Sequence, residues 1–235
     1  MKDDFLECEK WYCFLLLIMV GGYFGAYTYV LKGGVFCNAQ TANILIFAMS
    51  LGSLDFSKAL YLLIPISAYF IGTMVSEYLA LDVKRYNKLR WDTILIGIEI
   101  VTVIVLSLLP SNVPNQVFQV TINFICAMQF NTFRQAEKIP MATTFVTNHV
   151  RQTGSFFVRW LRKKEEISYL IRSFKHLSMI LGFIVGAMLS TVACYCFGNK
   201  AILGALVFLA ILFVNLLYAD LVKEKDLLHR VPNGH

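Results

Sequence analysis

Long apolar runs constrain this 235-residue chain more than any other feature of its sequence. About 20 consecutive apolar residues cross the ~30 Å hydrocarbon core of a bilayer as a helix, and six segments meet that requirement. They cover residues 12–31, 58–81, 92–110, 115–133, 176–197 and 200–220. Charged residues make up only 15% of the chain, whereas a soluble domain carries roughly 25%. The sequence therefore predicts an all-α integral membrane protein with six transmembrane helices.

Two shorter segments, 35–52 and 140–161, have a helical pattern but are poor candidates for full spans. The second contains His149, Arg151 and Arg159, and each arginine at a bilayer centre costs roughly 2.5–3.5 kcal/mol. We therefore predict that both segments are short re-entrant or half-buried helices. Full crossing by both segments is the alternative.

Basic residues in the loops favour the six-span arrangement. In that arrangement the loop 82–91, the stretch 159–175 and the C-terminal tail lie on one side, and the uncharged loop 111–114 lies on the other. Loops rich in lysine and arginine remain in the cytoplasm. We therefore predict a multi-pass protein of the cell (cytoplasmic) membrane with both termini cytoplasmic.

Three short sequence matches relate the two halves of the chain. QTAN at 40–43 aligns with FVTN at 145–148, GTMVS at 72–76 with GAMLS at 186–190, and TILIG at 93–97 with AILGA at 201–205. Each half, 1–110 and 111–235, then consists of a span, a short helix and two further spans. Because three crossings per half is an odd number, we predict an inverted internal repeat. Chance similarity among apolar helices is the alternative.

The segment GGYFGAYTYVLKGGVFCNAQTANI at 21–44 resembles the opening signature of the YoaK-type family of bacterial membrane proteins, whose function is unknown. That signature is a glycine-rich first helix with Asp-Ala, then Gly-Gly-x-Phe and Thr-Gly-Asn. The matching residues are Ala26, Tyr27, Gly33, Gly34, Phe36, Thr41 and Asn43. Gly25 stands where the family often has Asp, and Ala42 where it has the middle Gly. The resemblance covers nearly the whole chain and implies a multi-span protein that handles small molecules.

Polar residues on the two short segments are the first candidates for a binding site. Inverted repeats with interrupted helices build many secondary transporters, in which half-helix ends point at a site near the membrane midplane. Gly33-Gly34 precedes the first short helix and Pro140 starts the second, and exposed helix N-termini suit an anionic ligand. The candidates are Gln40, Thr41 and Asn43 on the first helix, and Thr144, Thr147, Asn148 and Arg151 in one stripe on the second. Hydrogen bonding between helices is the alternative role.

Three further candidates lie on the spans. Glu99 is near the middle of the span 92–110, and an intramembrane acid is a functional hypothesis by default. We assign it to ion coupling or substrate contact, with a neutral or paired structural role as the alternative. Gln129 and Arg134 lie at the end of the span 115–133. Arg134 is either an anion contact or an interfacial arginine that reaches the lipid headgroups.

These features together predict a secondary transporter of a small polar or anionic metabolite, with its site at the repeat interface. A channel and a non-transporting accessory or scaffold protein are the alternatives. The sequence has no H-E-x-x-H, G-x-S-x-G or P-loop motif, so we predict no enzyme activity, no cofactor and no metal site. The expected partners are the lipid bilayer and the transported molecule or ion, with a homodimer as one option and no nucleic acid.

Overall fold

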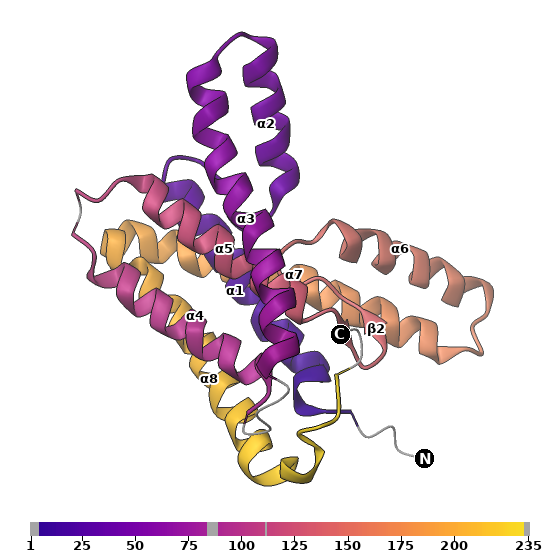
Figure 1. Ribbon diagram of the computed structural model, residues 1–235. Helices are drawn as coiled ribbons and strands as arrows, with labels where there is room; N and C mark the ends of the chain where they lie inside the picture. The colour runs from indigo at the N-terminus through magenta and orange to yellow at the C-terminus, as the bar shows by residue number, and fades with distance from the viewer. Residues whose placement is uncertain (1–4, 84–88, 111, 233–235) are drawn as a thin grey trace.

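The computed structural model describes residues 5–83, 89–110 and 112–232, most of which are helical (Figure 1). The main helices are α1 (Trp11–Leu31), α2 (Gln40–Gly52), α3 (Phe56–Val83), α4 (Trp91–Leu108), α5 (Asn115–Thr132), α6 (Thr147–Arg162), α7 (Ile167–Phe197) and α8 (Ala205–Tyr218). The short helical turns are η1 (Glu7–Glu9), η2 (Gly198–Gly204), η3 (Ala219–Lys223) and η4 (Lys225–Leu227). One antiparallel hairpin, β1 (Gln135–Ala136) with β2 (Ile139–Pro140), follows α5.

Four helical stretches in the described part of the chain are long and apolar enough to cross a membrane. They are Trp11–Leu31, Phe56–Ala80, Trp91–Leu108 and Ile167–Lys223, the last of which contains both α7 and α8. α5 is outside this set because amide side chains interrupt its apolar sequence, although most of it is buried inside the protein. The all-α fold and its fit to a membrane are therefore confirmed, while the number of six spans stays a prediction.

The start of the second short helix differs from the prediction. Residues 140–161 do not form one helix, because the chain first makes the β1–β2 hairpin and α6 begins only at Thr147. Glu137 and Lys138 form the hairpin turn with φ of 50° and 63°, the left-handed backbone that two-residue hairpin turns require. The expectation that Pro140 starts the helix is therefore wrong, since Pro140 ends β2.

Two other helix boundaries also differ from the prediction. The first short helix begins at Gln40 and not at residue 35, because Ala39 immediately before it has extended backbone, with φ of −149° and ψ of 123°. α7 begins at Ile167, well before the predicted start at residue 176. Its first turns pack against α6, so tertiary contacts extend this helix beyond its most apolar part.

Close helix pairs form the core of the protein. α1 packs along α7, α3 packs along α5, and α4 packs against α8. A Cβ atom on Gly186 would lie 2.0 Å from the backbone oxygen of Met19, and one on Gly72 would lie 2.5 Å from that of Phe124. Membrane helices often associate through such small residues, because lipid chains are as apolar as leucine and close packing is one of the main forces that hold the helices together.

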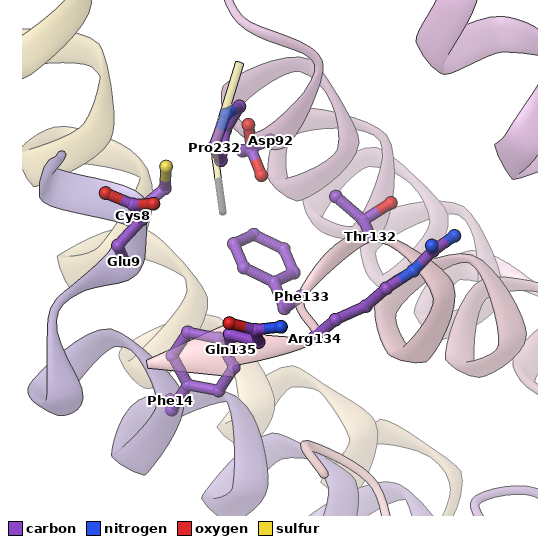
Figure 2. Close-up of a pocket in the computed structure, with 9 residues that line it drawn as sticks. All are labelled: Cys8, Glu9, Phe14, Asp92, Thr132, Phe133, Arg134, Gln135 and Pro232. Carbon is purple, nitrogen blue, oxygen red and sulfur yellow. The ribbon is translucent and has the colours of Figure 1, made fainter. Parts of the chain in front are cut away.

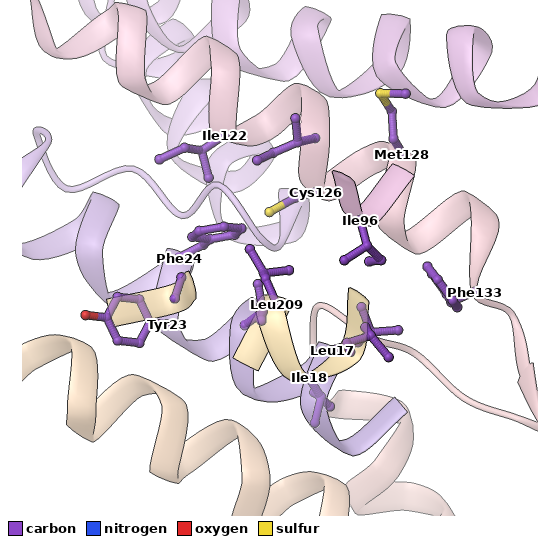
Figure 3. Close-up of a cluster of buried hydrophobic side chains, with 14 of the residues drawn as sticks. Leu17, Ile18, Tyr23, Phe24, Ile96, Ile122, Cys126, Met128, Phe133 and Leu209 are labelled. Carbon is purple, nitrogen blue, oxygen red and sulfur yellow. The ribbon is translucent and has the colours of Figure 1, made fainter. Parts of the chain in front are cut away.

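Buried apolar side chains fill the space around α1 (Figure 3). They include Leu17, Ile18, Tyr23 and Phe24 of α1, Ile96 of α4, Ile122, Cys126 and Met128 of α5, and Leu209 of α8. α1 is therefore the central helix against which the others are positioned. The α2–α3 and α6–α7 pairs form two helical hairpins that project from this core in different directions (Figure 1).

The two ends of the described chain meet at one end of the core. The Glu7 backbone N–H donates to Glu224 over 2.8 Å. Arg90, which precedes α4, donates to Asp220 over 2.9 Å and to Glu224 over 2.6 Å, and all three side chains are buried. Burial alone would raise the pKa of Glu7, but hydrogen bonds from two lysines and a tyrosine outweigh it and lower the pKa to about 2. These donors are Lys10, Lys223 and Tyr12.

Candidate functional site

The segments that lead into α2 and α6 meet beside the middle of α1. A Cβ atom on Gly21 would lie 2.6 Å from the Thr143 backbone oxygen, and one on Gly25 would lie 2.6 Å from the Asn38 amide. Asn38 Nδ2 in turn donates to the Thr144 backbone oxygen over 3.0 Å. Since Gly21 and Gly25 lie near the centre of α1, the segments that precede both short helices meet about halfway along it.

A cleft of about 970 Å³ lies between the first turns of α2 and α6. Its apolar wall combines aliphatic residues of α2 with aromatic residues of α3, α5 and the segment before α6. The apolar wall residues are Ala39, Ala42, Ile44, Leu45, Tyr69, Phe130 and Phe145. Its polar residues are Gln40, Thr41, Thr147, Asn148 and Arg151. These five are all residues that the sequence predicted as site candidates, and the structure brings them together.

The cleft combines several groups that attract an anion. Neither Ala39 nor Val146, the N-cap residues of α2 and α6, provides a side-chain cap. The first N–H groups of both helices therefore lack a side-chain acceptor at the positive ends of two helix dipoles. Arg151 donates to Asn148 Oδ1 over 2.9 Å and has no carboxylate partner among the described residues. The residues that line the cleft include no Asp or Glu.

Buried amides behind the cleft connect α2 to α5. Gln40 Nε2 donates to Asn123 Oδ1 over 2.6 Å, and Asn123 Nδ2 donates to the Gln119 backbone oxygen over 2.7 Å. Asn43, another predicted site residue, is fully buried and donates to the Phe36 backbone oxygen over 2.7 Å. Gln119 and Asn123 were not among the residues predicted from the sequence. Their i, i+4 spacing inside an apolar span was the available signal, because amides at membrane depth usually face the protein interior.

Gln129 and Thr144 lie buried near the cleft without lining it. Gln129 Nε2 donates to the Thr143 backbone oxygen over 3.2 Å, and its Oε1 has no hydrogen-bond partner among the described residues. The Thr144 hydroxyl also has no partner there. Because Thr144 precedes α6, it cannot belong to the helical stripe that was predicted to include it.

Glu99 and Arg134 are not brought together with the other candidates. Glu99 in α4 is fully buried, and neither carboxylate oxygen has a hydrogen-bond partner among the described residues. Arg134 pairs with Glu77 over 2.6 Å. Figure 2 shows Arg134 beside a separate pocket near Cys8 and Asp92, whose volume of about 10 Å³ leaves room for little more than a water molecule.

Two buried histidines join α6 to α7 behind Asn148 and Arg151. His149 Nε2 lies 2.9 Å from the Ala142 backbone oxygen, which can only accept, so this nitrogen carries the proton. His149 Nδ1 then accepts from His176 Nδ1 over 2.9 Å. The described residues contain no group of three or more His, Cys, Asp or Glu side chains that could hold a metal ion.

The comparisons with known proteins identify a family but no characterised relative. No curated protein matches the chain, and no solved structure matches it. Residues 13–215 match the family described as "Protein of unknown function (DUF1275)". This match covers most of the chain and confirms the resemblance to an uncharacterised family. The chain therefore belongs to the DUF1275 family of proteins of unknown function.

Proposed function

We propose that this protein is a secondary transporter that binds a small organic anion in the cleft between α2 and α6. The observation that carries this proposal is that two helix N-termini without side-chain caps and Arg151 open into one cleft, where the described residues place no carboxylate. Half-helix N-termini bind anionic substrate groups in transporters built from inverted repeats. The apolar wall, which includes Phe130 and Phe145 with rings 5.0 Å apart, would contact the carbon part of the solute.

Two glycine contacts support the inverted repeat that this proposal requires. Gly186 of α7 touches Met19 of α1, and Gly72 of α3 touches Phe124 of α5. Phe124 follows Met19 by 105 residues, the offset that relates QTAN to FVTN, and Gly186 follows Gly72 by 114 residues, the offset of GTMVS and GAMLS. Equivalent contacts thus join the two halves twice, with the glycine in the second half in one contact and in the first half in the other. This correspondence favours the inverted repeat over a chance alignment of apolar helices.

We further propose six spans with both termini in the cytoplasm. Three observations support a common side for the chain ends and the basic α6–α7 hairpin. Glu7 contacts Glu224, and Trp11 Nε1 at the start of α1 donates to Ser178 of α7 over 3.2 Å. α6 packs against the part of α7 that precedes Ser178. The 2.7 Å hydrogen bond from Lys32 to Asn199 lies at the opposite end of α1 and α7. Lys84, Arg85 and Lys88 of the loop 82–91, which also support this orientation, lie outside the described residues.

Counterflow in liposomes tests the transport proposal. The purified protein is reconstituted and loaded with unlabelled acetate, pyruvate, succinate or benzoate, and the uptake of the same radiolabelled anion is measured. We expect internal anion to accelerate uptake for at least one of them, with choline as the cationic control. Arg151→Gln should reduce this uptake about tenfold or more, since a hydrogen bond to a charged group contributes roughly 1.5–3 kcal/mol. Arg134→Gln removes the same charge outside the cleft and should leave uptake unchanged.

The outcomes separate the three functional classes. Uptake that internal anion does not accelerate would favour a channel. Absence of both uptake and binding for every anion would favour an accessory or scaffold protein. Equal loss in the Arg151→Gln and Arg134→Gln variants would contradict the assignment of the site to the cleft.

A further inference from the structure

The α6–α7 hairpin extends beyond the membrane-spanning core. α7 contains 31 residues, so its length is about 46 Å at 1.5 Å per residue, against ~30 Å of hydrocarbon. Trp11 at the start of α1 contacts Ser178, and the part of α7 before this contact packs against α6. Figure 1 shows this pair projecting away from the other helices. The hairpin is therefore placed at the level of the lipid headgroups on the side of the two chain ends.

An apolar face of the hairpin is exposed and has no protein partner among the described residues. On α6 the exposed apolar residues recur at helical spacing, and the stripe continues onto the first turns of α7. They are Val150, Phe157, Val158, Leu161, Ile167, Ile171 and Phe174. A neighbouring face of α6 packs on α7 through Phe156 and the His149–His176 pair. A helix with one packed face and one exposed apolar face at the headgroup level is suited to lie against acyl chains.

Basic side chains surround a hollow of about 240 Å³ near the tip of the same hairpin. Its lining residues are Arg159, Arg162 and Lys163 from the end of α6 and Tyr169 from α7. Arg159 and Arg162 have no carboxylate partner among the described residues, and Lys163 pairs with Glu166 over 3.3 Å. The Arg159 guanidinium lies 5.3 Å from the centre of the Phe156 ring, which holds it beside the hollow. Two unpaired guanidinium groups and a phenol hydroxyl match the hydrogen-bonding needs of a phosphate.

We propose that this hollow binds the phosphate of an anionic phospholipid such as phosphatidylglycerol, while the exposed apolar face of the hairpin lies against the bilayer. Charge complementarity selects a phosphate, and the position of the hairpin at the headgroup level selects a lipid over free phosphate. Glu165 and Glu166 are the acidic residues at this tip, and five basic residues between 159 and 172 outnumber them. The site is separate from the transport cleft. The proposal depends on the membrane location of the protein and not on transport.

Lipid retention in native mass spectrometry tests the proposal with the full chain. The protein is purified in detergent, titrated with dioleoyl phosphatidylglycerol or dioleoyl phosphatidylcholine, and analysed for bound lipid. We expect phosphatidylglycerol to bind more tightly, and the Arg159→Gln/Arg162→Gln variant to bind it about thirtyfold more weakly, since each basic residue near an anionic surface contributes ~1 kcal/mol. Lys200→Gln removes a charge beyond the opposite end of α7 and should retain the wild-type affinity.

Further measurements distinguish a lipid site from a site for free phosphate and from a general effect of charge. Unchanged thermal unfolding of the double variant without added lipid would show that it folds normally. Millimolar inorganic phosphate should not displace the lipid, and full displacement would show that the hollow binds free phosphate instead. Equal affinity for both lipids, or equal loss in Lys200→Gln, would overturn the proposal. Arg151→Gln should keep lipid retention even if it abolishes anion uptake, so a failure of one proposal is distinguishable from a failure of the other.

Discussion

Replacing Gly186 by alanine tests the contact between α1 and α7. The added Cβ atom would lie 2.0 Å from the Met19 backbone oxygen and 2.8 Å from its carbonyl carbon. Both atoms belong to the backbone of α1, so they cannot rotate away as a side chain could, and the two helices must separate. Overpacking of this kind costs roughly 1–3 kcal/mol. The better helix propensity of alanine offsets about 1 kcal/mol of this cost. Taking the upper end of the overpacking range, we expect the free energy of unfolding to fall by about 2 kcal/mol.

Gly154 provides the matched control, because the same substitution in α6 adds a Cβ atom with no other atom within 4 Å. Thermal unfolding can be followed by labelling of cysteines, five of which are buried in the folded protein. Since 1 kcal/mol corresponds to roughly 2–4 °C for a protein of this size, Gly186→Ala should lower the midpoint by about 4–8 °C. Gly154→Ala should leave it unchanged or raise it slightly. Equal midpoints for the two variants would refute the packing argument.

Three further predictions concern charged residues. Arg90→Met leaves Asp220 and Glu224 buried without their cation and should reduce the free energy of unfolding by about 3–5 kcal/mol. The same cysteine-labelling assay measures this loss. A loss below about 1 kcal/mol would show that water screens the cluster. Because the folded pKa of Glu7 is about 2 against an ordinary value of 4.5, its stabilising contribution is complete above pH 4.5 and disappears as the pH falls towards 2. Glu7→Gln should therefore be less stable than wild type at pH 7 and lose less stability between pH 4.5 and 2; parallel curves would exclude this role. Glu99→Gln should abolish the pH dependence of anion uptake in liposomes if Glu99 exchanges a proton, and an unchanged pH profile would remove it from the coupling mechanism.

The long apolar helices were predictable because their composition alone determines them. The predicted spans 12–31 and 58–81 agree within two residues with α1 and α3, since a membrane helix needs about 20 apolar residues whatever its neighbours are. Helix starts at glycine and proline were not predictable in the same way. Pro140 is compatible with the first turn of a helix and with a hairpin strand, and only the Glu137-Lys138 turn decides between them.

The polar residues of the cleft were predictable because they lie in the first turns of α2 and α6, and residues at the start of a helix can be placed from the local sequence. Their partners were not, because Asn38 and Asn123 meet Thr144 and Gln40 only after the loops fold back beside α1. His176 is similar, since 27 residues separate it from His149. Tertiary contacts of this kind leave no local pattern in a single sequence.

The arrangement of the cleft also makes a prediction about stability without a ligand. Two helix N-termini and Arg151 place positive potential in one cleft whose lining has no acidic residue, which is unfavourable until an anion binds. Each interaction of a charge with a helix terminus amounts to about 0.3–1 kcal/mol. Arg151→Gln should therefore stabilise the protein by roughly 1 kcal/mol in an anion-free buffer, a rise of about 2–4 °C in the unfolding midpoint, while it weakens anion binding. A structural role for Arg151 predicts the opposite sign, so a lower midpoint in the variant would show that the positive charge serves the fold and not a ligand.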